Sequence, residues 1–259
     1  MSTATVEPTT LDVSGTPRIP LSRLTRVELR KLADTRASRW LLIAIAAITA
    51  LIIVIFFINA DASDRTFTNF MGVTATPQGF LLPVLGILLV TSEWSQRTAL
   101  VTFTLMPVRG RVLLAKVLAA LIAGFAAIIL AMAIAALATL AGGGDKPWAN
   151  IGLDDIGKFC LLQVSGIMQG LAFGLLFLSS AAAIVTFFVL PTAFSIVASL
   201  WGALKDAAPW IDLGTSQQPL FSGDNLSGEQ WWQLTTSTII WVVLPFVVGL
   251  VRVLRAEVK

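Results

Sequence analysis

Six long apolar segments divide the chain, and shorter polar or charged segments separate them. A helix needs about 20 apolar residues to cross the hydrocarbon core, so the pattern predicts spans at about residues 40–59, 76–94, 112–141, 159–178, 182–204 and 234–251. The uncharged stretch from Phe159 to Leu204 is too long for one crossing, and we divide it at Ser179-Ser180. The division leaves a very short turn between the fourth and fifth spans.

The segment before the first span has two parts. Residues 1–17 are rich in Ser, Thr and Pro and have no apolar period, which predicts a disordered tail. Residues 19–39 are predicted to form an amphipathic helix in the membrane interface. Its leucines and arginines fall on opposite sides of a helical wheel, namely Leu21, Leu24, Leu29 and Leu32 against Arg23, Arg26 and Arg30. Residues 18–259 are therefore expected to form one membrane domain.

The charges are unevenly distributed around the six spans. Alternate connecting segments on one side hold 14 of the 18 Lys and Arg residues, whereas the other side holds 4 of them and 9 of the 15 acids. Cytoplasmic segments near spans carry the excess of Lys and Arg, so both termini are predicted to be cytoplasmic. The small net charge of +3 and its position beside the spans indicate contact with the lipid leaflet and argue against nucleic-acid binding.

Composition supports a membrane protein and excludes several kinds of site. Hydrophobic residues make up 56% of the chain and charged residues 13%, far from the usual soluble domain. The chain has no His and a single Cys, Cys160, which excludes His-based triads, HExxH zinc sites and an internal disulfide. No Asp, Glu, Lys or Arg lies deep within a predicted span, which disfavours an ion-coupled carrier.

One short motif suggests an ATPase but has a better structural interpretation. Residues 226–230 read LSGEQ, close to the LSGGQ signature of ATP-binding-cassette ATPases. The chain has no GxxxxGK[ST] phosphate loop that would hold the phosphates, and the motif falls in a segment predicted to be external. Ser227 and Gln230 have the spacing of a capping box, so we expect a helix to begin there.

The polar segment after the second span contains the strongest candidate site. It runs from Thr91 to Lys116 and combines an acid near a span end with a cluster of basic residues. This segment resembles the coupling region of ABC-2 transporter permeases, in which an E-x-x-x-G-T element precedes a Pro-x-x-Arg-like turn and a Lys that opens the third span. The matching residues are Glu93, Thr98, Pro107, Arg111 and Lys116, with Arg109 as an alternative for the turn position.

Two details of this segment bear on its geometry. Arg97 stands where the family usually has Gly before Thr. Glu93 lies four residues before Arg97 and would share a helical face with it if the helix continues. Glu93 is alternatively expected to pair with a basic residue of the lead-in helix, whose Glu28, Lys31 and Arg36 resemble the family's amphipathic lead-in.

The resemblance covers nearly the whole chain and implies an all-α permease with the six-span fold of type V exporters. It implies a bacterial plasma-membrane protein that dimerises with itself or a sister permease and binds two copies of a separate ATPase. ATP and Mg would be bound by that ATPase, so this chain is expected to be no enzyme and to carry no cofactor or metal. The coupling residues would be Glu28, Lys31, Arg36, Glu93, Arg97, Thr98, Pro107, Arg109, Arg111 and Lys116.

The resemblance further implies that the second and fifth spans line the substrate pathway. The apolar lining there favours export of a lipophilic compound, such as a drug, an antibiotic or a lipid. The candidate pathway residues are Phe80, Val84, Ile87, Thr91, Phe187, Phe188 and Phe194.

Other interpretations remain open at this point. The chain could be a membrane scaffold or sensor subunit that binds a partner without transport, or, with less support, an ion-coupled secondary transporter. Glu93 and the arginines near it could also be simple anchors at the lipid headgroups.

Overall fold

The computed structural model describes residues 19–106, 108–142, 144, 146–148, 151–221 and 225–256. The predicted tail at 1–17 and the candidate coupling residue Pro107 lie outside these residues. All regular structure in the described part of the chain is helical. Six of the described helices are long and apolar enough to cross a membrane, which agrees with the predicted all-helical architecture of six spans.

The first half of the chain supplies three of these long helices and the helix before them. The helices are α1 (Leu21–Asp34), α2 (Arg36–Asn59), the 3-10 turn η1 (Ala62–Asp64), α3 (Phe67–Ser95), α4 (Ala99–Leu105) and α5 (Arg109–Gly142).

The second half supplies the other three and a set of short helices. They are α6 (Leu153–Phe177), α7 (Ser180–Leu200), α8 (Gly202–Ile211), α9 (Leu213–Gln217), the 3-10 turn η2 (Gln218–Phe221), α10 (Gly228–Thr238), the π-helical turn η3 (Ile239–Val243) and α11 (Leu244–Arg255). The last three form one helix, Gly228–Arg255.

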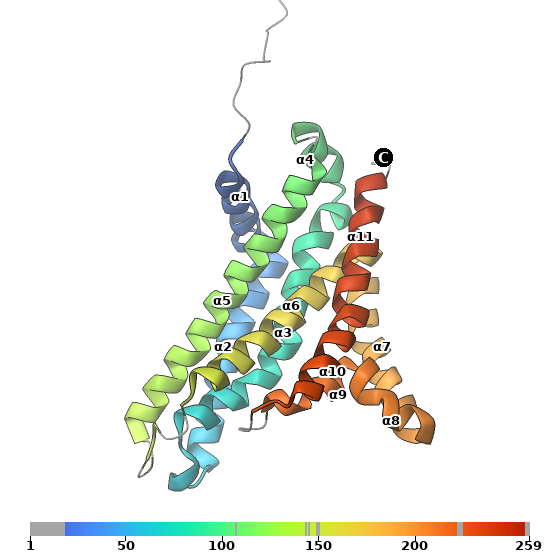
Figure 1. Ribbon diagram of the computed structural model, residues 1–259. Helices are drawn as coiled ribbons and strands as arrows, with labels where there is room; N and C mark the ends of the chain where they lie inside the picture. Colours follow the sequence, from blue (N-terminus) through green and yellow to red (C-terminus); the bar gives the residue numbers. More distant parts are fainter. Residues whose placement is uncertain are drawn as a thin grey trace, which may run out of the picture.

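Figure 1 shows α1, α4 and the C-terminal end of α11 at one end of the bundle and α8 at the other. The short turn between α6 and α7 is at the first of these ends, because the Ser180 hydroxyl lies 2.7 Å from the Thr91 hydroxyl and 3.1 Å from that of Ser95. Successive connections between the long helices thus lie at alternate ends of the bundle, as six crossings require. We refer below to the end with α1 and α4 as the α1 end.

α3 and α6 form the centre of the bundle. About 61% of the most apolar window of each helix is buried, against 17% for α2 and for α7. Small residues let the two backbones approach closely. A Cβ atom on Gly86 would lie 2.8 Å from the Ile167 carbonyl oxygen, and one on Gly170 would collide with the Pro83 carbonyl. The outward faces of α2 and α7 are left for lipid or another chain.

A buried amide pair also joins these two helices. Gln163 donates from Nε2 to Oε1 of Gln78 at 3.1 Å, and Gln78 donates from its own Nε2 to the Ala127 carbonyl of α5 at 3.2 Å. Both glutamines are about 1% exposed. Such interhelical bonds satisfy polar groups where no water is present, so the pair sets the register of α3, α5 and α6.

Several predicted boundaries are wrong. The lead-in helix, expected over 19–39, ends at Asp34, because Thr35 is extended (φ −73°, ψ 132°) and α2 begins at Arg36. α3 starts nine residues earlier than expected, at Phe67, and α6 starts at Leu153 rather than at 159. The first turn of α6 is charged, and that of α3 mixes Thr68 and Asn69 with buried phenylalanines, so both helices continue beyond the uninterrupted apolar run. The predicted turn near Ser179-Ser180 is confirmed, with Leu178 in the left-handed region at φ 54°.

The segment after the fifth span contains helices that hydropathy did not reveal. α7 ends at Leu200 rather than 204, and α8 and α9 follow. Asp212 caps α9, accepting from the Thr215 N–H at 3.1 Å and from the Ser195 hydroxyl of α7 at 3.0 Å. The Trp241 indole donates to the Ile211 carbonyl at 2.7 Å. These bonds attach the short helices to α7 and to the last long helix.

The capping box at the start of α10 is confirmed. The Gln230 N–H donates to the Ser227 hydroxyl at 3.2 Å, and the Ser227 N–H donates to Gln230 Oε1 at 2.8 Å. The LSGEQ motif therefore begins the sixth long helix, which runs from Gly228 to Arg255 rather than over 234–251.

Candidate functional site

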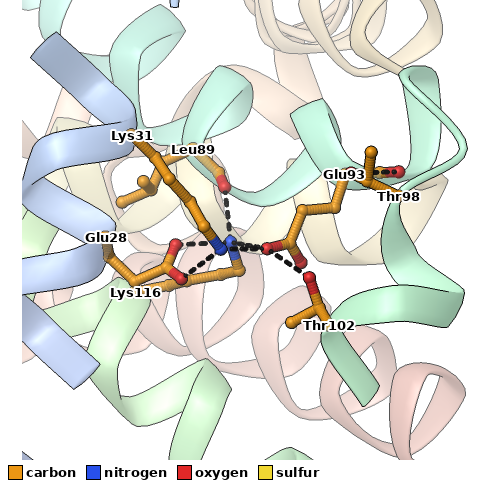
Figure 2. Close-up of polar contacts among 7 residues, drawn as sticks. All are labelled: Glu28, Lys31, Leu89, Glu93, Thr98, Thr102 and Lys116. Atoms are coloured by element: carbon orange, nitrogen blue, oxygen red, sulfur yellow. Dashed lines mark hydrogen bonds and ion pairs between the residues drawn. The ribbon is translucent and has the colours of Figure 1, made fainter. Parts of the chain in front are cut away.

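Four charged side chains from three helices meet near the α1 end of the bundle. Glu28 and Lys31 come from α1, Glu93 from the last turn of α3 and Lys116 from the third turn of α5. Figure 2 shows the two amino groups between the two carboxylates. We call these four residues the ion-pair network. All four were candidate coupling residues in the sequence.

The network has short distances and three buried members. Lys116 Nζ lies 2.7 Å from Glu28 Oε2 and 3.3 Å from Glu93 Oε1. Lys31 Nζ lies 2.7 Å from Glu28 Oε1 and 2.6 Å from Glu93 Oε1. Glu28, Glu93 and Lys116 are only 3%, 4% and 2% exposed, whereas the Lys31 side chain is 36% exposed. Each carboxylate therefore contacts both amino groups.

The network is balanced in charge and has further hydrogen bonds. Lys116 also donates to the Leu89 carbonyl at 3.1 Å, and the Thr102 hydroxyl of α4 donates to Glu93 Oε1 at 3.2 Å. Burial lowers the pKa of Lys31, but the carboxylates of Glu28 and Glu93 have the larger combined effect and raise it above the usual lysine value. A buried charge without a partner would be costly, so each member depends on the others.

The arrangement holds helices together. It joins α1 to α3, α4 and α5 through charge-assisted bonds, which are short and directional. We infer that a displacement of α1 is passed to the end of α3 and to α5, because separating them would leave buried charges unpaired.

The turn after α3 corrects one expectation. The helix ends at Ser95 and Arg97 has φ 56°, so Glu93 and Arg97 do not share a helical face. Arg97 is exposed, and the Thr98 N–H donates to the Glu93 carbonyl at 2.8 Å. A positive φ is unfavourable for residues with a Cβ and favours glycine. The backbone at residue 97 would therefore suit glycine better than the arginine that this chain has there.

Two arginines in the first turn of α5 attach the first and last described segments of the chain to the same corner of the bundle. Arg109 donates from Nη1 to the Val253 and Ala256 carbonyls at 2.9 and 2.6 Å, at the end of α11. Arg111 donates to the Ile19 carbonyl at 2.6 Å, just before α1. Arg36, in contrast, is exposed at the start of α2 and has no contact with the ion-pair network.

Sequence reasoning missed two partners in the network, Thr102 and the Leu89 carbonyl. Thr102 reaches Glu93 only because the chain reverses at Arg97 into α4. A threonine in a short apolar helix gives no signal of such a role. The Leu89 carbonyl is available because Lys116 enters between α3 and α5.

A second candidate region is an open pocket on the other half of the bundle. It has a volume of about 360 Å³ and lies between α3, α6, α7 and the short helices α9 and η2. Three candidate pathway residues line it, Phe80, Phe187 and Phe188, and we call it the aromatic pocket. The rings of Phe80 and Phe188 are 5.7 Å apart and those of Phe187 and Phe188 5.0 Å apart. Gln169, Gln217 and Gln218 add amide groups to this lining.

The other candidate pathway residues lie elsewhere. Ile87 is fully buried against Phe173 and Leu213, and Phe194 packs on Trp241 with ring centroids 5.8 Å apart. Thr91 is buried at the α1 end, where its hydroxyl donates to the Ile87 carbonyl. Val84 is half-buried on α3 and is not among the residues that line the pocket.

Within the described residues, no group of three or more His, Cys, Asp or Glu side chains could hold a metal ion.

Comparison with known proteins adds no functional information. No protein-family model matches the chain, and no curated protein matches it.

Proposed function

We propose that the chain is the membrane-spanning permease subunit of an ATP-binding-cassette exporter of the ABC-2 type. The observation that carries the proposal is the ion-pair network. The resemblance marked Glu28, Lys31, Glu93 and Lys116 as coupling residues from three distant segments, and each lysine amino group lies within 3.3 Å of both glutamate carboxylates.

The network fits the step that such a permease needs. A separate ATPase would press on the surface at the α1 end, where α1 and α4 are exposed to a partner. Because ion pairs join α1 to α3 and α5, and the Thr102 hydroxyl of α4 donates to Glu93, that push would move the long helices as a unit. Arg97 at φ 56° supports the same family, since glycine is usual at this position.

The aromatic pocket supports a lipophilic substrate. Apolar and aromatic walls with a few polar groups are typical of small-molecule sites, and Phe80, Phe187 and Phe188 supply the aromatic part. The outward face of α7 is largely unburied, which would suit a second permease subunit. ATP and Mg would be held by the two ATPase copies and this chain would have no catalytic role.

The charge pattern supports the proposed orientation. The α1 end would face the cytoplasm of a bacterial plasma membrane, because the segments there hold 14 of the 18 Lys and Arg residues and such residues stay on the cytoplasmic side.

The proposal is tested in a complex of this chain with an ATP-binding-cassette ATPase encoded beside its gene, reconstituted in liposomes. Glu93→Ala should leave co-purification intact but abolish most substrate-stimulated ATP hydrolysis, because the carboxylate links α1, α4 and α5. The matched control is Glu229→Ala, at an exposed glutamate on α10, which should behave like the wild type.

The same experiment separates the alternatives. Failure of any such ATPase to co-purify would favour a scaffold or sensor that binds another partner. Wild-type stimulation in the Glu93→Ala complex would show that the network anchors helices without coupling them to ATP hydrolysis.

A further inference from the structure

A polar pocket at the α1 end lies apart from the ion-pair network. Its volume is about 460 Å³, and it lies where α2 begins, α3 ends and α7 begins. It is lined by Thr35, Arg36, Ala37, Ser38, Leu88, Ser92, Ser95, Gln96 and Ser180. We call it the serine pocket. Its lining contains one cation, several hydroxyl groups and no acidic side chain.

Two long helices begin at this pocket without caps. α2 has 24 residues and α7 has 21, and neither N-cap residue, Thr35 or Ser179, makes a side-chain capping bond. The hydrogen-bond ladders begin with the Arg39 N–H to the Thr35 carbonyl and the Ala183 N–H to the Ser179 carbonyl. The backbone N–H groups that precede Arg39 in α2 and Ala183 in α7 have no intrahelical partner. The first turn of neither helix holds an acid, so no carboxylate in these turns offsets the positive ends of the two helix dipoles.

Two hydroxyl groups in the lining lack partners. Ser38 is 4% exposed, and no hydrogen bond among the described residues involves its hydroxyl. The Thr35 hydroxyl is buried and likewise has no partner within the described part of the chain. Buried polar groups are normally hydrogen-bonded, so the buried Thr35 hydroxyl calls for an explanation such as an absent ligand, whereas the Ser38 hydroxyl keeps access to the pocket. An acceptor within the pocket would satisfy both groups.

Arg36 supplies the matching charge. It is exposed at the rim of the pocket and has no ion pair with any described residue. Two acids are sequence neighbours of residues that line the pocket, Asp34 beside Thr35 and Glu93 beside Ser92, but neither lines it. Glu93 is held in the ion-pair network. Free N–H groups at helix starts, hydroxyls and a guanidinium are together the donors that bind phosphate.

We propose that the serine pocket binds a phosphate group, with Arg36, Ser38 and the N-terminal turns of α2 and α7 as its donors. The proposal does not depend on the transport function. A phosphate could belong to an anionic lipid or to a soluble phosphate compound. Leu88 in the lining and the starts of two membrane-spanning helices place the pocket at the level expected for headgroups.

The test is a binding titration on the full chain purified in detergent, followed by native mass spectrometry. The probes are dioleoyl phosphatidylglycerol, dioleoyl phosphatidylcholine and inorganic phosphate alone. Arg36→Gln combined with Ser38→Ala should weaken binding of phosphatidylglycerol about tenfold, the effect of losing a charge-assisted bond. Arg36→Gln alone changes only an exposed side chain. If the double variant folds poorly, this single variant still tests whether Arg36 contributes to phosphatidylglycerol binding.

The matched control is Arg39→Gln, three residues further along α2, exposed and outside the pocket lining. It should bind phosphatidylglycerol like the wild type. Displacement of the lipid by inorganic phosphate would identify a soluble phosphate compound as the ligand, and resistance to displacement would identify the lipid. The proposal would be overturned if the wild type, Arg36→Gln and the double variant all bound phosphatidylglycerol with the same affinity and all bound phosphate with the same affinity.

Discussion

Removing Lys116 should destabilise the protein far more than removing Lys31, although each lysine pairs with the same two glutamates. Lys116 is 2% exposed and its amino group contacts Glu28, Glu93 and the Leu89 carbonyl. Lys116→Met would leave two buried carboxylates with one half-exposed cation. Breaking a buried pair in this way costs about 3–5 kcal/mol. Lys31→Met removes a cation that water screens, with an expected cost of about 1 kcal/mol.

The measurement is the free energy of unfolding in mixed micelles, followed by tryptophan fluorescence. Lys205→Met, at an exposed lysine of α8, controls for the change of side chain and should be neutral within about 0.5 kcal/mol. Equal losses for Lys116→Met and Lys31→Met would refute the reasoning, because they would show that burial does not decide the strength of these pairs.

A double variant provides a sharper test of the same reasoning. Glu28→Gln combined with Lys116→Met leaves Lys31 and Glu93 as one balanced pair. Its loss of stability should be smaller than the sum of the two single losses by at least about 1 kcal/mol, since residues of one network couple by about 0.5–3 kcal/mol. Simple additivity would mean that the charges do not interact as their distances indicate.

Three further changes test separate features. Arg97→Gly should leave stability equal or higher while Arg97→Val lowers it by about 1 kcal/mol, because Arg97 has φ 56° and β-branched residues tolerate this region worst; equal melting temperatures for the two variants would contradict this. Ser227→Ala should cost about 1 kcal/mol of stability through loss of the cap, and ATP binding by the purified chain that disappears with this change would show the motif to be a nucleotide site. In a Cys160→Ala background, an impermeant thiol reagent should label Asp64→Cys but not Arg109→Cys in intact cells, and the reverse pattern would invert the proposed orientation.

The length and polarity of each segment were enough to predict the six long helices and the return of both chain ends to one end of the bundle. The capping box was also readable, because Ser227 and Gln230 interact locally, within one turn. Helix limits were less predictable. Polar first turns, such as those of α6 with Asp154 and Asp155, continue a helix beyond the apolar run that hydropathy detects.

The short helices after α7 were not predictable from hydropathy, since they depend on tertiary bonds. Asp212 reaches the hydroxyl of Ser195, and Trp241 reaches the carbonyl of Ile211, 30 residues away. Tertiary packing also decides which candidate pathway residues line the pocket and which are buried in the core. The packing of α7 on α3 and α6 decides that Phe187 and Phe188 line the pocket while Ile87 is buried.

The resemblance read from the sequence placed Glu28, Lys31, Glu93 and Lys116 among ten candidate coupling residues, but it did not separate these four from the arginines that lie outside the ion-pair network. Only the tertiary structure decided their partners. Glu93 was expected to pair with Arg97 on one helix or with the lead-in helix, and the left-handed Arg97 removes the first option. Glu28 and Lys116 lie 88 residues apart and meet because α1 packs on α5. Ion pairing over such a separation depends on how helices cross, which local sequence patterns do not encode.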